Sequence, residues 1–106
     1  MSEIIEVDPQ TVKDWLEQNE ARLIDVREHQ ELMSYSIEGA VHNPMSTFDV
    51  EAVPTDGSQK LVFVCAHGVR SFQVGQHLLD NKHISEAYNL SGGVAAWANT
   101  SFQGPA

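Results

Sequence analysis

The only cysteine of the chain, Cys65, stands between the most strand-like run of the sequence, residues 61–64, and the most helix-like run, residues 70–81. A cysteine at the end of a buried parallel strand, followed by a short loop and a helix N-terminus, occupies the edge where α/β sheets bind ligands. The chemistry open to it is nucleophilic, through the thiolate. Because a thiol with an ordinary pKa of about 8.5 is only about 3% ionised at pH 7, the surrounding loop decides whether the sulfur reacts.

The loop after this cysteine has features that lower the pKa of a thiol. Gly68 allows a tight backbone turn, and Arg70 and Ser71 open the predicted helix. We expect the N–H groups of residues 66–71 to point inward around the sulfur and, with the helix dipole and Arg70, to form an anion cradle. The candidate site is therefore Cys65 together with Ala66, His67, Gly68, Val69, Arg70 and Ser71.

The residues alone leave two alternatives open at this site. Cysteine is among the most buried residue types, so a single one at a strand end can be a small, inert hydrophobe. His67 either tunes the cradle or touches substrate, or it is an exposed loop residue without a catalytic role. The five histidines are scattered and one cysteine cannot build a thiolate metal site, so we expect neither a metal ion nor a cofactor.

Length, charge and cysteine content restrict the class of protein. The 106 residues, 42% hydrophobic and 20% charged, fit one globular domain over residues 1–106 with one core. A net charge of −9 with only six Lys and Arg argues against nucleic-acid or membrane partners, because phosphate contacts need clustered basic side chains. One cysteine allows no intramolecular disulfide, and the start lacks the basic and apolar regions of a secretory signal. We therefore expect a cytoplasmic protein.

Apolar patterns and turn residues predict alternating strands and helices. Strands are predicted at residues 3–7, 22–26, 39–44, 61–64 and 86–90, and helical segments at 9–19, 27–33, 45–52, 70–81 and 94–99. Connections too long for hairpins imply βαβ units with right-handed crossovers, hence a parallel sheet covered on both faces. This is a three-layer α/β/α fold. The run 61–64 is expected at its centre because it is apolar without alternation, and Pro44 confines 39–44 to an edge.

Helical spacing also predicts which side chains are buried. On the helix 70–81, the apolar stripe is expected to consist of Phe72, Gly75, Leu78 and Leu79. Trp15 and Trp97 are expected in the core, and His42 is interpreted as structural. The tail, residues 100–106, is expected to be loosely held.

Four stretches, in order, resemble those of single-domain rhodaneses, a family of sulfurtransferases. They are LIDVRE at 23–28, GAVHNP at 39–44, the loop with Cys65, four residues, Arg70 and Ser71, and LSGGVAAW at 90–97. The resemblance spans about residues 4–98. It implies a rhodanese-like α/β/α domain with a five-stranded parallel sheet.

The resemblance also implies a reaction and partners. By it, the Cys65 thiolate would take sulfane sulfur from a donor such as thiosulfate, hold it as a persulfide among the loop amides, and pass it to cyanide or a thiol. Arg70 would position an anionic donor or brace the loop. Asp25 and Arg27 would support the pocket, although Arg27 can instead form a purely structural ion pair with Glu31.

Three further functions are compared with this one. The related cell-cycle phosphatases have five residues between Cys and Arg, whereas this loop has four, residues 66–69. The tighter loop suits a single sulfur atom, so phosphatase and arsenate reductase activity rank below sulfur transfer. The other alternative is a carrier or docking module that takes sulfur only from a specific protein of a sulfur relay, with the acidic surface selecting that partner.

Overall fold

The structure is a computed structural model that describes residues 3–55 and 58–99. It contains a five-stranded parallel sheet in the order β1-β5-β4-β2-β3. The strands are β1 (Ile5–Val7), β2 (Ala21–Asp25), β3 (Val41–His42), β4 (Lys60–Val64) and β5 (Tyr88–Leu90). The predicted parallel sheet is confirmed, with β4 at its centre and β3 at one edge.

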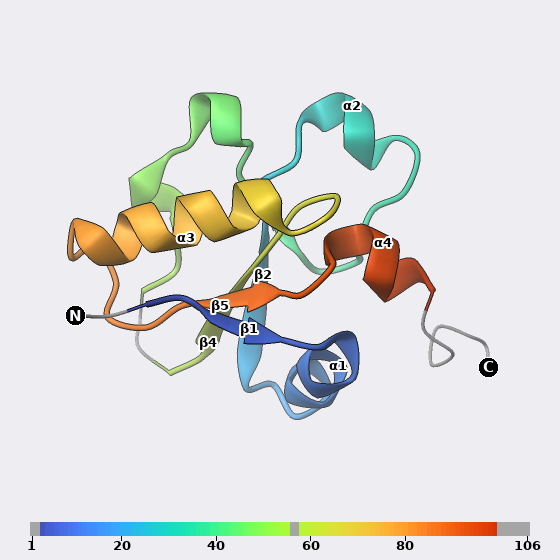
Figure 1. Cartoon of the computed structure of the whole chain (residues 1–106), viewed down its shortest axis with the longest axis horizontal. Helices are drawn as coiled ribbons and strands as arrows, with labels where there is room; N and C mark the ends of the chain where they lie inside the picture. Colours follow the sequence, from blue (N-terminus) through green and yellow to red (C-terminus); the bar gives the residue numbers. More distant parts are fainter. Residues whose placement is uncertain (1–2, 56–57, 100–106) are drawn as a thin grey trace.

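Helices cover both faces of the sheet, as predicted (Figure 1). They are α1 (Pro9–Glu17), α2 (His29–Leu32), α3 (Val69–Asp80) and α4 (Gly93–Ala98), with two 3-10 helices, η1 (Met45–Thr47) and η2 (Val50–Ala52). Side chains of α1 and α4 share one apolar cluster, while α3 and the segment around η2 share the other. The fold is therefore three-layered, α/β/α.

The central strand shows why its sequence is apolar without alternation. Leu61 and Phe63 of β4 belong to the cluster under α3, whereas Val62 and Val64 belong to the cluster under α1 and α4. All four side chains are buried, and three of them, Val62, Phe63 and Val64, are 0% exposed. Burial on both faces fixes β4, and this places the residue that follows it at the carboxyl edge of the sheet.

Two predicted core positions differ in the structure. Phe72 is 40% exposed, because the buried stripe of α3 runs through Ser71, Val74, Gly75 and Leu78. The prediction was wrong at Phe72 because it followed the spacing of apolar residues, whereas the structure buries the polar side chain one position earlier, Ser71. Trp15 is only half-buried and packs edge-on against Tyr88, with 5.0 Å between ring centroids. Trp97 is buried as expected, and the tail, residues 100–106, lies outside the described residues.

Candidate active site

Cys65 directly follows β4 and belongs to the short loop that leads into α3. Gly68 precedes α3 with a φ of +100°, a left-handed conformation that glycine adopts without strain. This turn brings the first N–H groups of α3 back toward the sulfur. Cys65 itself is 1% exposed and forms part of the core under α3.

Hydrogen-bond donors converge on Cys65 Sγ. The N–H groups of Gly68 and Ser71 point at it with N···S distances of 3.1 and 3.3 Å, and the Ser71 hydroxyl oxygen lies 3.3 Å away. Burial raises the pKa of the thiol, but hydrogen bonds from the Ser71 hydroxyl and from the N–H groups of Ser71, Gly68 and His67 outweigh it and hold the pKa below its usual value. A packed, inert cysteine has no need of such donors, so the geometry favours the thiolate interpretation.

The guanidinium of Arg70 binds a carboxylate of α2. Its two terminal nitrogens donate to the two carboxylate oxygens of Glu31, each at 2.8 Å. This hydrogen bonding lowers the pKa of Glu31 to about 2 against the opposing effect of burial, and it raises the pKa of Arg70. This ion pair ties the start of α3 to α2 and, of the two roles considered for Arg70, it favours the brace.

Asp25 and Arg27 form a buried ion pair at the end of β2. Arg27 Nε donates to Asp25 Oδ1 at 3.0 Å and Nη2 donates to Oδ2 at 2.8 Å, while Nη2 also reaches the carbonyl of Tyr35 at 2.9 Å. The side chains are 4% and 1% exposed, Arg27 first. The alternative ion pair of Arg27 with Glu31 was wrong, because Glu31 binds Arg70. The observed pair joins Asp25, the last residue of β2, to Arg27 and through it to the Tyr35 carbonyl.

Sequence reasoning did not single out Asn89 of β5, a buried polar residue that is 1% exposed. Its Oδ1 lies 2.5 Å from Ser71 Oγ, and its Nδ2 donates to the Gly68 carbonyl and to Glu6 Oε2, both at 3.0 Å. A usable signal was present, since an Asn near the carboxyl end of a buried parallel strand needs hydrogen-bond partners. Asn89 thus links the first strand to the loop around Cys65.

The start of α4 packs directly on the backbone of the loop. The N–H groups of Val94 and Ala95 donate to the carbonyls of Cys65 and Ala66 at 2.8 and 3.1 Å. Gly93 has a φ of +63°, and a Cβ built on it would lie 2.4 Å from the Cys65 carbonyl oxygen. Only a glycine permits this approach, which explains the glycine at the first position of α4.

Comparison with known proteins assigns the family. A family model described as "Rhodanese-like domain" matches residues 8–100. The chain belongs to the rhodanese-like domain family. The resemblance inferred from the four stretches is thereby confirmed.

Relatives of this rhodanese-like chain carry sulfurtransferase names. It is 33% identical to a Bacillus subtilis protein named putative sulfurtransferase YtwF over 90% of this chain and 91% of the relative. It is 26% identical to a Vibrio cholerae protein named thiosulfate sulfurtransferase GlpE, covering 92% and 91% respectively. A crystal structure of a rhodanese-like domain protein from Staphylococcus aureus is 27% identical, with a TM-score of 0.77 and coverage of 92% and 95%.

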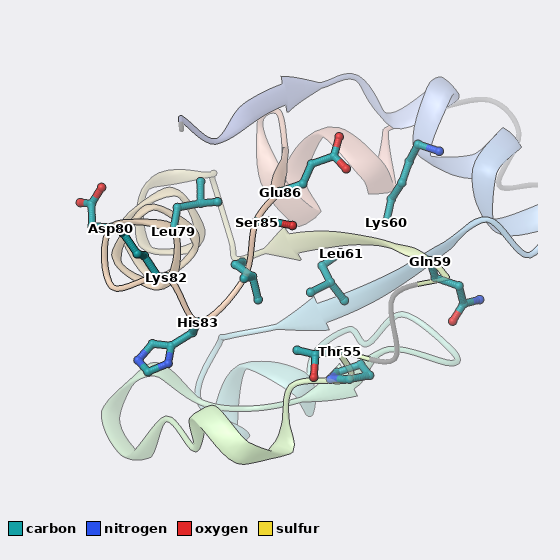
Figure 2. Close-up of a pocket in the computed structure, with 12 residues that line it drawn as sticks. Thr55, Gln59, Lys60, Leu61, Leu79, Asp80, Lys82, His83, Ser85 and Glu86 are labelled. Carbon is teal, nitrogen blue, oxygen red and sulfur yellow. The ribbon is translucent and has the colours of Figure 1, made fainter. Parts of the chain in front are cut away.

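A concave region of this rhodanese-like fold lies at the end of the sheet opposite to Cys65, around the start of β4. The hollow has a volume of about 1010 Å³. Figure 2 shows Leu61 from the start of β4 and Leu79 from the end of α3 among the residues around it. Lys60, also on its lining, has its ammonium nitrogen 5.1 Å from the centre of the Trp15 ring. Because Cys65 follows the other end of β4, this hollow is separate from the candidate site.

Two features are absent from the part of the chain that the structure describes. Within residues 3–55 and 58–99, no group of His, Cys, Asp and Glu side chains is placed to hold a metal ion. In that same part of the chain, no helix combines the length and the apolar character that crossing a membrane requires.

Proposed function

We propose that this rhodanese-like protein is a sulfurtransferase whose nucleophile is Cys65. The observation that carries the proposal is the convergence of N–H and hydroxyl groups on Cys65 Sγ, at 3.1 to 3.3 Å. Such donors stabilise a sulfur anion, and the accompanying decrease in the pKa of the thiol favours the reactive form. The sulfurtransferase names of relatives at 33% and 26% identity support the same class of reaction.

The reaction has two transfers of one sulfur atom. The Cys65 thiolate attacks the outer sulfur of thiosulfate, an Sγ–S bond forms, and the S–S bond of the donor breaks to release sulfite. Cyanide or a thiolate then attacks the outer sulfur of the persulfide. With cyanide, the new bond gives thiocyanate, and the Sγ–S bond breaks to regenerate the thiolate. Charge and sulfur balance in both steps without any added oxidant or reductant.

The residues around Cys65 divide this task. The N–H groups of Gly68 and Ser71 stabilise the negative charge of the thiolate on Cys65 Sγ, as preorganised dipoles do for other anions. Arg70 fixes the start of α3 through Glu31. The buried pair of Asp25 and Arg27 keeps the neighbouring strand end in place.

The test is thiocyanate formation from thiosulfate and cyanide by the wild type and by Cys65→Ser. The variant keeps the size of the side chain and the hydrogen-bonding groups around it, so it is expected to fold with a Tm near that of the wild type. Loss of activity with the fold retained supports the proposal. Undiminished turnover by Cys65→Ser would contradict it.

A carrier that serves a specific protein donor is the second candidate, and two observations favour it. Both terminal nitrogens of Arg70 are bound by Glu31, so the permanent charge of the loop is already neutralised in this structure. The net charge of −9 also disfavours encounter with a dianion such as thiosulfate. If the carrier hypothesis holds, added salt slows sulfur transfer from a basic protein persulfide but not from thiosulfate. Equal slowing of both reactions would argue against it.

A further inference from the structure

The orientation of the Asn89 side-chain amide is fixed by its neighbours. Nδ2 donates one proton to the Gly68 carbonyl and the other to the Glu6 carboxylate, both at 3.0 Å. Those two neighbours only accept, so a flipped amide would place Oδ1 against two oxygens. Oδ1 therefore faces Ser71 Oγ, 2.5 Å away.

The Ser71 hydroxyl has one proton and two neighbours that can accept it. Asn89 Oδ1 lies 2.5 Å from Ser71 Oγ, and Cys65 Sγ lies 3.3 Å from it. A hydroxyl donates one hydrogen bond at a time, so donation to Asn89 removes a donor from the sulfur. The shorter contact favours donation to Asn89 while Cys65 is a neutral thiol, whose own S–H can then donate to Ser71 Oγ.

We propose that Asn89 is a positioning residue that competes with Cys65 Sγ for the Ser71 hydroxyl proton, so that this hydroxyl stabilises the thiolate only when it turns from Asn89 to the sulfur. The inference deepens the proposed function, because it concerns how the nucleophile of that reaction is formed. It predicts that Asn89 raises the pKa of the Cys65 thiol above the value that the surrounding N–H and hydroxyl donors would give it without this competition. The backbone N–H groups of Gly68 and Ser71 remain directed at the sulfur in both states.

Asn89 also acts on the loop in a second way, which the experiment must separate. By binding the Gly68 carbonyl it holds the turn that presents the Gly68 N–H to the sulfur. Loss of this brace would raise the pKa of Cys65, whereas release of the Ser71 proton would lower it. The two effects of removing Asn89 thus have opposite signs, and only the second requires Ser71.

The charged and titratable groups around this network come from four elements. Glu6 of β1 binds Asn89, and Arg70 of α3 binds Glu31 of α2 at the start of the same helix that carries Ser71. His67 belongs to the loop itself and is exposed. These four residues are left unchanged in the variants below, so their effects on the pKa of Cys65 cancel in the comparison.

A double-mutant cycle tests the proposal, with the wild type, Asn89→Ala, Ser71→Ala and the double variant. In each protein the pKa of Cys65 is measured from the pH dependence of its alkylation by iodoacetamide and from thiolate absorbance. In the Ser71→Ala background, Asn89→Ala reports the brace alone. With Ser71 present, the shift in the pKa of Cys65 caused by Asn89→Ala is expected to be lower by about one unit than the shift in the Ser71→Ala background. One unit is a tenfold change in the ratio of thiolate to thiol, as expected for one hydrogen bond to a charged group.

A second replacement, Asn89→Leu, keeps the branched shape of the side chain without an acceptor and repeats the cycle if Asn89→Ala does not fold. The same negative coupling with Ser71 is expected. An identical shift in pKa with and without Ser71 would overturn the proposal and leave Asn89 as a structural brace. Because the pKa is read without any sulfur donor, this result stays distinguishable from a failure of sulfur transfer.

Discussion

Replacing Gly93 by alanine tests whether contact between α4 and the loop backbone shapes the site. An alanine Cβ at this position would lie 2.4 Å from the Cys65 carbonyl oxygen and 2.6 Å from the carbonyl carbon and oxygen of Ala66. All three atoms belong to the backbone, so no side-chain rotation relieves the overlap. Gly39 offers a matched control, since its φ of +87° is equally left-handed but nothing lies within 4 Å of the added Cβ.

The expected losses follow from these two geometries. A left-handed conformation costs an alanine about 1 kcal/mol, and this is the whole loss expected for Gly39→Ala. In Gly93→Ala, α4 must also move away from the loop, which weakens the hydrogen bonds from Val94 and Ala95 to the loop carbonyls. At about 1 kcal/mol for each bond, the loss in the free energy of unfolding rises to about 3 kcal/mol.

Urea unfolding measures both losses, and the alkylation rate of Cys65 measures the effect on the loop. Gly93→Ala is expected to destabilise more than Gly39→Ala and to change the alkylation rate, whereas Gly39→Ala is expected to leave that rate near the wild-type value. If the two variants lose the same free energy of unfolding and react alike, contact between α4 and the loop does not shape the site.

Two further predictions concern the ion pairs. The pKa of Glu31 falls from 4.5 to about 2 on folding, so its pair with Arg70 stabilises the protein above pH 4.5 and is lost as the pH falls toward 2. Because both side chains are about a third exposed, Glu31→Gln should lower the free energy of unfolding in urea by about 1 kcal/mol at pH 7 and by almost nothing near pH 2. A difference between the two proteins that does not change with pH would contradict this. Arg27→Met should lower the free energy of unfolding by about 3 kcal/mol, because it leaves the buried Asp25 without its ion-pair partner. Adding Asp25→Leu to the same chain should recover part of this loss. If nothing is recovered, the loss comes from packing.

Features set by short stretches of sequence were predictable. Apolar residues without alternation identified the central strand, and the lone Cys65 at its end identified the candidate site. The helix ends were also close, because Asp8 with Pro9 and the glycines before α3 and α4 act on the backbone near them. In each case the signal and the structure it determines lie within a few residues of each other.

Features that depend on partners from distant elements were not predictable from one sequence. Arg70 binds Glu31, 39 positions away, although Arg27 stands nearer to Glu31 in sequence. The burial of Ser71 in place of Phe72 follows from the cradle, which turns a polar side chain inward. The role of Asn89 arises only when β1, β5 and the loop meet, since its partners are Glu6, Gly68 and Ser71.

The most direct test of the central claim is the intact mass of the reduced protein before and after treatment with thiosulfate, with Cys65→Ser treated alike. The account predicts that the wild type alone gains the mass of one sulfur atom and that cyanide removes it. The same gain in Cys65→Ser, or a gain that cyanide does not reverse, would contradict a persulfide on Cys65. If neither protein gains mass, treatment with a protein persulfide donor decides, and a wild type that still gains no sulfur refutes the account.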